Sequence, residues 1–316
     1  MTQEQNPNTT MRLQIRRPTI LAAASLICLT TACSRTAKPP TTLNALELLL
    51  SGTSKGPVES ANILSASGLR SAGQVDAEAS QPVVKTWAAH IRSETARHAY
   101  RFRQKPSEFE NSEGFFKMLM MAVVLAEDFH VHYKGELKSE PGQTTTNDGF
   151  FANPDDVFLT GLLGPKREGT CSSMPVLYVA IGRELGYPLK LVTTKGHMFV
   201  RWEGAGERFN IETTAHGLSR FDDEYYRHWP FEITPEEEAD EGYLKSLTPS
   251  EELAAFLSIR GMCLRESGRI SEAADAFAAA ARFAPGCRSY RTMTTNLQNQ
   301  LKAARSLPKS SNQNRT

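Results

Sequence analysis

The stretch that decides the fold runs from Gly169-Thr170-Cys171 through Gly196-His197 to Asn210-Ile211-Glu212-Thr213-Thr214. His197 follows Cys171 by 26 positions, and Glu212 follows His197 by 15. A cysteine, a histidine and a carboxylate are the residue types of a nucleophile, its base and the group that orients the base. Cys171, His197 and Glu212 are therefore candidate catalytic residues.

The residues after Cys171 predict a helix that begins close to the cysteine. Apolar residues recur at helical spacing at Met174, Leu177, Tyr178, Ile181 and Leu185. Pro175 is compatible only with the first turn, because its missing N–H has no partner there in any case. Cys171 is thus expected at or just before the helix N-terminus, where free N–H groups and the positive end of the helix dipole stabilise a thiolate.

After this helix, the sequence predicts three antiparallel strands, at Leu189 to Thr194, His197 to Glu203 and Arg208 to Thr213. If Gly204-Ala205 forms the two-residue loop of the second hairpin, His197 lies directly opposite Glu212. Opposed Cβ atoms are about 5 Å apart, so the carboxylate could hold the imidazole. The same register also places Arg201 opposite Arg208, which is unfavourable.

These blocks, Cys171 at a helix start, then Gly196-His197-Met198-Phe199-Val200-Arg201-Trp202, then Phe209 to Thr214, resemble the core of the transglutaminase-like superfamily of cysteine enzymes. The resemblance covers about residues 150 to 230. It implies an α+β fold with a papain-like core, in which the helix bearing the cysteine packs on an antiparallel sheet. It also implies Cys171 as nucleophile, His197 as base and Glu212 at the position where the family usually has aspartate. The superfamily includes members that have lost catalysis.

The function predicted from this resemblance is acyl transfer on a protein or peptide substrate, by hydrolysis or by transamidation. A non-catalytic envelope scaffold that binds a protein or peptide through the cleft and a C-terminal helical repeat is the alternative. Neither a cofactor nor a metal is expected. Gly204-Ala205-Gly206 lacks the third glycine of a dinucleotide loop, and His130 and His132 lack a third ligand at metal spacing.

The N-terminus predicts export. Arg12, Arg16 and Arg17 precede an apolar run from Ile20 to Leu29 that is too short to span a bilayer and suits a signal peptide. The run ends in Leu29-Thr30-Thr31-Ala32-Cys33, which resembles a bacterial lipoprotein signal. The resemblance implies lipidation of Cys33 and a lipid anchor in the cell envelope. Plain secretion is the alternative, because Thr30 stands where such signals prefer leucine.

A second pattern lies near the C-terminus. Small, aromatic and proline residues have the spacing of one 34-residue tetratricopeptide repeat between about 254 and 287, at Leu257, Gly261, Leu264, Gly268, Ala273, Phe277, Ala280 and Pro285. Because one repeat cannot form a solenoid, the alternatives are a helical hairpin packed on the catalytic domain and a peptide-binding module.

The resulting organisation has five parts: a signal peptide (1–32), a tether with an N-terminal helix (33–82), a transglutaminase-like domain (83–232), a tetratricopeptide-like helical module (248–305) and a disordered tail (306–316). Helices are expected at 83–99 and 113–130, and Thr234 and Thr248 are expected to cap two more.

Composition restricts the class of partner. The chain has 316 residues and a formal net charge of +1, which becomes −1 without residues 1–32, so nothing favours a nucleic acid. Without Cys28 and Cys33, the cysteines are Cys171, Cys263 and Cys287, too few for a disulfide framework, and all three are expected to be thiols. The oligomeric state is not indicated.

Overall fold

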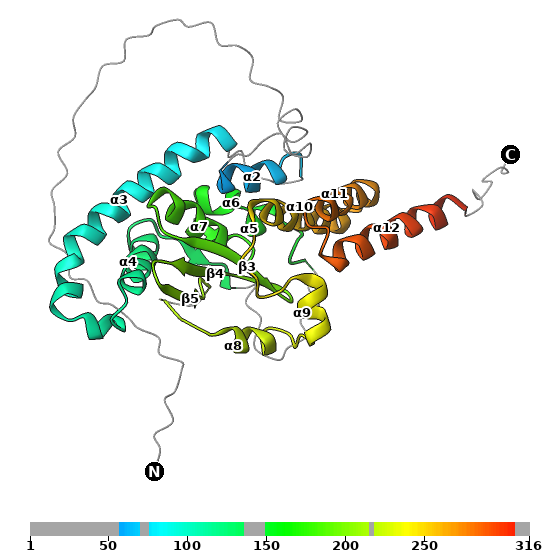
Figure 1. The fold of residues 1–316 in the computed structure, drawn as a ribbon. Coiled ribbons are helices and arrows are strands. Elements are labelled where there is room, and N and C mark those ends of the chain that lie inside the picture. The colour runs from blue at the N-terminus through cyan, green and yellow to red at the C-terminus, as the bar shows by residue number, and fades with distance from the viewer. Residues whose placement is uncertain (1–56, 70–75, 136–148, 215–217, 307–316) are drawn as a thin grey trace, which may run out of the picture.

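A computed structural model describes residues 57–69, 76–135, 149–214 and 218–306 (Figure 1). The described chain is α+β, with a three-stranded antiparallel sheet, a two-stranded parallel sheet and helices around them. The predicted signal peptide, Cys33 and residues 307–316 of the predicted tail lie outside the described residues. Within the described ranges, no helix is both long enough and apolar enough to cross a membrane.

The elements from the N-terminus to the sheet are α2 (Val58–Ser65), α3 (Ala77–Gln104), the 3₁₀ helix η1 (Pro106–Phe109), α4 (Glu113–Glu127), β1 (His132–Tyr133), α5 (Pro154–Val157), α6 (Leu159–Leu163), β2 (Glu168–Gly169) and α7 (Met174–Glu184). They continue as β3 (Leu189–Thr194), β4 (His197–Gly204), β5 (Glu207–Ile211), α8 (Asp223–His228), α9 (Pro235–Glu241), α10 (Pro249–Glu266), α11 (Ile270–Phe283) and α12 (Arg288–Ser306).

The sheet β3-β4-β5 has the predicted strands but not the predicted second hairpin. Gly204 pairs with Glu207, so the loop is Ala205-Gly206 and the prediction of Gly204-Ala205 is wrong. The backbone φ angles are 56° at Ala205 and 80° at Gly206. A type I′ hairpin turn needs φ above zero at both central positions, and the glycine satisfies this at the second.

The corrected register is offset from the prediction by two residues. Arg201 pairs with Asn210 rather than Arg208, and the arginine Nε donates to the Asn210 side chain over 2.7 Å. Because side chains alternate with a period of two, this offset leaves every side chain on its predicted face. His197 and Glu212 therefore share a face but are diagonal neighbours, and the prediction that they lie directly opposite is wrong.

Both faces of the sheet are buried. On one face, Leu191, Val200 and Ile211 belong to the main hydrophobic core, against which α7 packs. The close approach of α7 depends on Gly182, because a Cβ there would lie 2.3 Å from Leu189 Cδ1. On the other face, Phe199 stacks on Tyr226 of α8 with ring centroids 3.8 Å apart. The sheet is thus held between α7 and α8.

The C-terminal module consists of α10, α11 and α12. Gly261 lies under the ring of Phe277, where a Cβ would come within 2.6 Å of Cε2, so the small residue lets α10 and α11 pack closely. The predicted caps are confirmed, since Thr234 and Thr248 each form a capping box at the start of α9 and α10. The end of α12 projects away from the rest of the molecule (Figure 1).

This module packs directly on the rest of the fold. Arg183 of α7 donates to both carboxylate oxygens of Glu252 on α10, whose side chain is 3% exposed. The segment before α10 also bonds to the free edge of β3, through Leu244 N to Thr193 O and Leu247 N to Leu191 O, both 2.9 Å. One hydrophobic core extends from α3 and α7 into α10 and α11.

Candidate active site

Cys171 lies in a tight turn immediately before α7, as the sequence predicts. Both Ser173 N and Met174 N donate to Thr170 O, over 3.1 and 2.9 Å. The hydroxyls of Thr170 and Ser173 both donate to Asp156 O, at 2.9 and 3.1 Å. These buried bonds fix the turn to α5, so the thiol is presented on a rigid support at the positive end of a helix.

His197 lies at the start of β4, within hydrogen-bonding reach of both other candidates. Its Nε2 is 2.8 Å from Glu212 Oε2, and the two side chains are 3% and 4% exposed. Its imidazole also hydrogen-bonds with the Cys171 side chain. Because Glu212 engages Nε2, Nδ1 is the nitrogen available to the thiol. The structure thus brings the three predicted residues together.

Both carboxylate oxygens of Glu212 take part in hydrogen bonds. Oε1 accepts from Thr214 N over 2.9 Å and from Thr214 Oγ1 over 2.6 Å. Oε2 accepts from the hydroxyl of Tyr226 over 3.2 Å, besides its contact with His197. A buried carboxylate that is fully hydrogen-bonded can remain ionised, which is what an orienting group for an imidazole needs.

The pair His197 and Glu212 is held in its charged form. Burial opposes a charged imidazole, but the Glu212 carboxylate and the Cys171 side chain raise the pKa of His197 to about 10. Burial likewise acts to raise the pKa of Glu212, but the imidazole and the bonds from Thr214 outweigh it and lower that pKa. An imidazolium next to a thiol is the arrangement that activates cysteine nucleophiles.

Tyr133, which the sequence analysis does not single out, completes the surroundings of Cys171. Tyr133 pairs with Gly169 in the parallel β1-β2 ladder, two residues before the cysteine. Its hydroxyl hydrogen-bonds with the Cys171 backbone, and burial raises the pKa of the phenol. The phenol is therefore a neutral hydroxyl next to Cys171.

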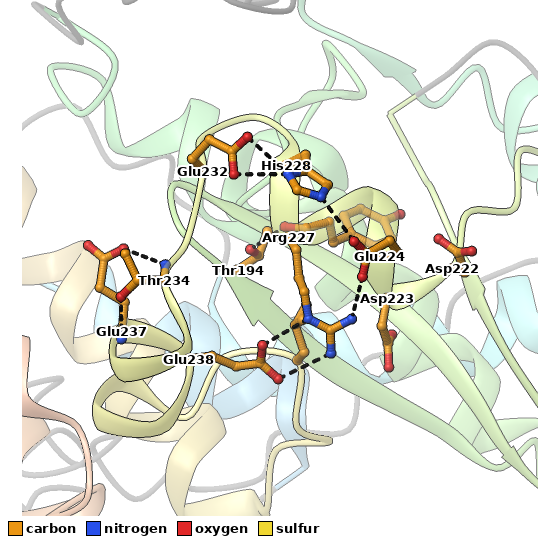
Figure 2. Close-up of polar contacts among 12 residues, drawn as sticks. Thr194, Asp222, Asp223, Glu224, Arg227, His228, Glu232, Thr234, Glu237 and Glu238 are labelled. Atoms are coloured by element: carbon orange, nitrogen blue, oxygen red, sulfur yellow. Dashed lines mark hydrogen bonds and ion pairs between the residues drawn. The ribbon is translucent and has the colours of Figure 1, made fainter.

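The segment that follows α8 forms one wall of the site. The ring of Trp229 meets His197 edge-on, with centroids 4.6 Å apart. Figure 2 shows how this segment is fixed: His228 lies between Glu224 and Glu232, with its ring nitrogens 3.0 and 2.9 Å from their carboxylates. Arg227 lies between Glu224 and Glu238, at 2.9 Å from each (Figure 2). These contacts link α8 to the segment that follows it and to α9.

Cys171 and His197 line a cavity of about 260 Å³, whereas Glu212 is not among its lining residues. Ligand pockets are commonly about 300 to 1,000 Å³, so this cavity is suited to one or two side chains. Its walls come from the Cys171 turn, the β3-β4 hairpin, the Trp229 segment and, unexpectedly, from α10 and α12. The C-terminal module thus contributes directly to the site.

The other two described cysteines, Cys263 and Cys287, are free thiols, as predicted. Burial raises the pKa of Cys263 to about 12. Burial also raises the pKa of Cys287, to about 11. In the part of the chain that the structure describes, no group of three or more His, Cys, Asp or Glu side chains could hold a metal ion.

The sequence analysis found the three central side chains but missed those that position them. Thr214 belongs to the quoted sequence motif, but the motif does not indicate what Thr214 does. No sequence pattern points to Tyr133, Tyr226 or Trp229, because only tertiary contacts bring them to the site.

Comparison with protein-family models, with curated proteins and with solved structures finds no match to this chain.

Proposed function

We propose that the protein is a cysteine-dependent acyl-transfer enzyme with a transglutaminase-like, papain-like core, and that it acts on an amide or ester of a peptide. The observation that supports this most is His197 in contact with the Cys171 thiol on one side and with the buried Glu212 carboxylate on the other. A purely structural role for His197 would not explain why its imidazole contacts a thiol that lines a cavity.

The proposed reaction has two stages. The Cys171 thiolate attacks the acyl carbon, the C–S bond forms, and the imidazolium of His197 gives its proton to the leaving amine or alcohol as the C–N or C–O bond breaks. Water or a second amine then attacks the thioester while His197 takes its proton. The thiolate leaves, and the acid or the new amide is released.

The oxyanion of each tetrahedral intermediate needs hydrogen-bond donors. The backbone N–H of Cys171 is one donor. The Tyr133 hydroxyl, which already contacts the Cys171 backbone, is the second when it turns its O–H toward the substrate oxygen. Removing one such donor typically costs about 100-fold to 1,000-fold in turnover.

Alkylation of the cysteines in the native protein tests the proposal. Iodoacetamide at about pH 7 should modify Cys171 at least roughly 100-fold faster than Cys263 and Cys287, because burial raises the pKa of both other thiols. Peptide mapping by mass spectrometry gives each rate. In a His197→Ala variant, Cys171 should be modified more slowly than in the wild type while the rates at Cys263 and Cys287 stay unchanged, because His197 contacts only the Cys171 thiol. Equal, slow modification of all three thiols would instead favour the non-catalytic scaffold.

We also propose that the enzyme is a lipid-anchored protein of the bacterial cell envelope, on the basis of the apolar run that ends in Ala32-Cys33. A Cys33→Ser variant expressed in a bacterium should move from the membrane fraction to the soluble fraction, whereas Cys28→Ser, in the removed signal, should not. Continued membrane association of Cys33→Ser would argue against the anchor.

A further inference from the structure

The cavity at Cys171 continues to the C-terminal module. Cys171 lines one part of this cavity. Another part is lined by Glu241 and Tyr243, at and just after the end of α9, and by Tyr290 of α12. The segment with Tyr243 lies beside β3, since Leu244 N donates to Thr193 O. A substrate at Cys171 therefore has a side pocket between the catalytic core and the module.

Aromatic side chains form part of the walls of this side pocket, and no Lys or Arg lines the cavity. Tyr243 and Tyr290 line it together with Trp229 and Phe231. Burial raises the pKa of both tyrosines, so they carry no charge at neutral pH. Aromatic faces accommodate an alkyl chain, and they also attract a cation that lies against them.

Glu241 places a negative charge in this aromatic pocket. Its Oε2 accepts from Ser289 N over 2.9 Å and from the Cys287 thiol over 3.1 Å. Among the described residues, its Oε1 has no hydrogen bond, and no Lys, Arg or His forms an ion pair with the carboxylate. By contrast, the adjacent Asp240 is paired with Arg288 at 3.0 Å and does not line the cavity.

We propose that this side pocket binds a cationic alkyl side chain, such as that of lysine, next to the acyl group that Cys171 attacks. The inference rests on the proposed function and specifies its substrate: a peptide with a basic residue near the reacting carbonyl. The alkyl stem packs on the aromatic walls, and the ammonium binds Glu241 Oε1. A charge-assisted bond of this kind is selective, because a neutral side chain leaves the carboxylate without a cation.

The test compares two thiol-directed probes on the full chain, N-acetyl-lysyl and N-acetyl-norleucyl acyloxymethyl ketone. Norleucine has almost the same stem as lysine but no ammonium. The lysyl probe should label Cys171 roughly tenfold faster. Glu241→Gln should bring the two rates to parity, since the amide oxygen can still accept from Ser289 N but carries no charge. Asp240→Asn, the matched control, should keep the lysyl preference.

Iodoacetamide separates this inference from the proposed function, because it reaches Cys171 without using the side pocket. If iodoacetamide labels Cys171 selectively but the two ketones react equally with the wild-type chain, the inference is overturned and the proposed function stands. That comparison needs no variant, so it holds even if Glu241→Gln folds poorly.

If Cys171 reacts with no probe, the proposed function fails and calorimetry decides the inference alone. N-acetyl-lysine methylamide should then bind the full chain roughly tenfold more tightly than the norleucine analogue. Glu241→Gln should abolish the difference. Equal binding of the two amides, or binding of neither, would overturn the inference.

Discussion

At the scale of the residue, the length of Glu212 matters. In the observed register the carboxylate residue is diagonal to His197, and diagonal neighbours in a sheet are about 7 to 8 Å apart, further than directly opposed ones. Glutamate, one methylene longer than aspartate, spans this distance with an Nε2 to Oε2 contact of 2.8 Å. The length of the glutamate side chain is thus matched by the geometry of the sheet.

Shortening this side chain should therefore impair the site. In Glu212→Asp the carboxylate withdraws from the imidazole, and we expect the rate of alkylation of Cys171 to fall about tenfold, because the imidazole is no longer held in place beside the thiol. The rate is read by peptide mapping, with Glu203→Asp on the exposed end of β4 as control. An unchanged rate in Glu212→Asp would show that the reach of glutamate is irrelevant.

The charge of Glu212 sets the protonation of His197. Because the folded pKa of His197 is raised to about 10, the pair stabilises the fold fully below the imidazole's usual 6.5 and loses this stabilisation as pH rises through about 10. In Glu212→Gln the pKa of His197 should fall, and the alkaline limit of the proposed acyl transfer, which needs the imidazolium as proton donor, should move to lower pH with it. Titration of the His197 ring by NMR measures the pKa directly. A His197 pKa that is the same in both proteins would contradict the charged pair.

Individual site residues could be predicted from the sequence only where they belong to a recognisable motif. Cys171, His197 and Glu212 lie in quoted blocks, and the turn before α7 follows from Pro175 and the apolar spacing. Tyr226 could not be predicted, because its hydroxyl reaches Glu212 only after α8 packs on the sheet.

At the scale of the element, strands were predictable and their register was not. Alternation marks each strand, but the hairpin contains glycine at both 204 and 206, and each suggests a different loop. Packing decides between them: a Cβ at Gly204 would lie 2.7 Å from Pro188 Cβ, so this glycine is needed inside the strand. Gly206 is left for the turn, where its positive φ is required.

The hairpin of α10 and α11 depends on another close approach. Alanine at an exposed helical position stabilises a helix by up to about 1 kcal/mol over glycine. Gly261→Ala should instead lower the free energy of unfolding by about 1 to 2 kcal/mol, because its Cβ meets the Phe277 ring at 2.6 Å. Denaturant unfolding measures the change. The control is Gly286→Ala, where a Cβ meets nothing within 4 Å and no loss is expected. A stabilised Gly261→Ala protein would contradict the close packing.

At the scale of the whole molecule, the C-terminal module and the rest of the fold share one hydrophobic core and one half-buried ion pair, Arg183 with Glu252. The sequence predicted both parts but left open whether the module packs on the core or binds a peptide. The open point depended on long-range contacts, which local spacing does not encode. In the structure the module does pack on the core, and it also lines the cavity.

This shared core predicts that the two parts unfold together. All three tryptophans lie before residue 248, outside the module. Glu252→Gln on α10 should nonetheless lower the unfolding midpoint seen by tryptophan fluorescence, with a loss of about 1.5 to 3 kcal/mol from the charged hydrogen bonds to Arg183. Helix content, followed by circular dichroism, should change in the same transition. Separate transitions by the two probes would show independent domains.

The central claim, that Cys171 forms a thioester with an acyl group, is tested most directly by trapping that intermediate. The protein is mixed with p-nitrophenyl acetate and quenched in acid, and its mass and the release of p-nitrophenol are recorded. We predict a rapid burst of one p-nitrophenol per chain and one acetyl group, mapped to Cys171, with neither in Cys171→Ala. An acetyl group that never appears on Cys171, or a burst that persists in Cys171→Ala, would contradict the account.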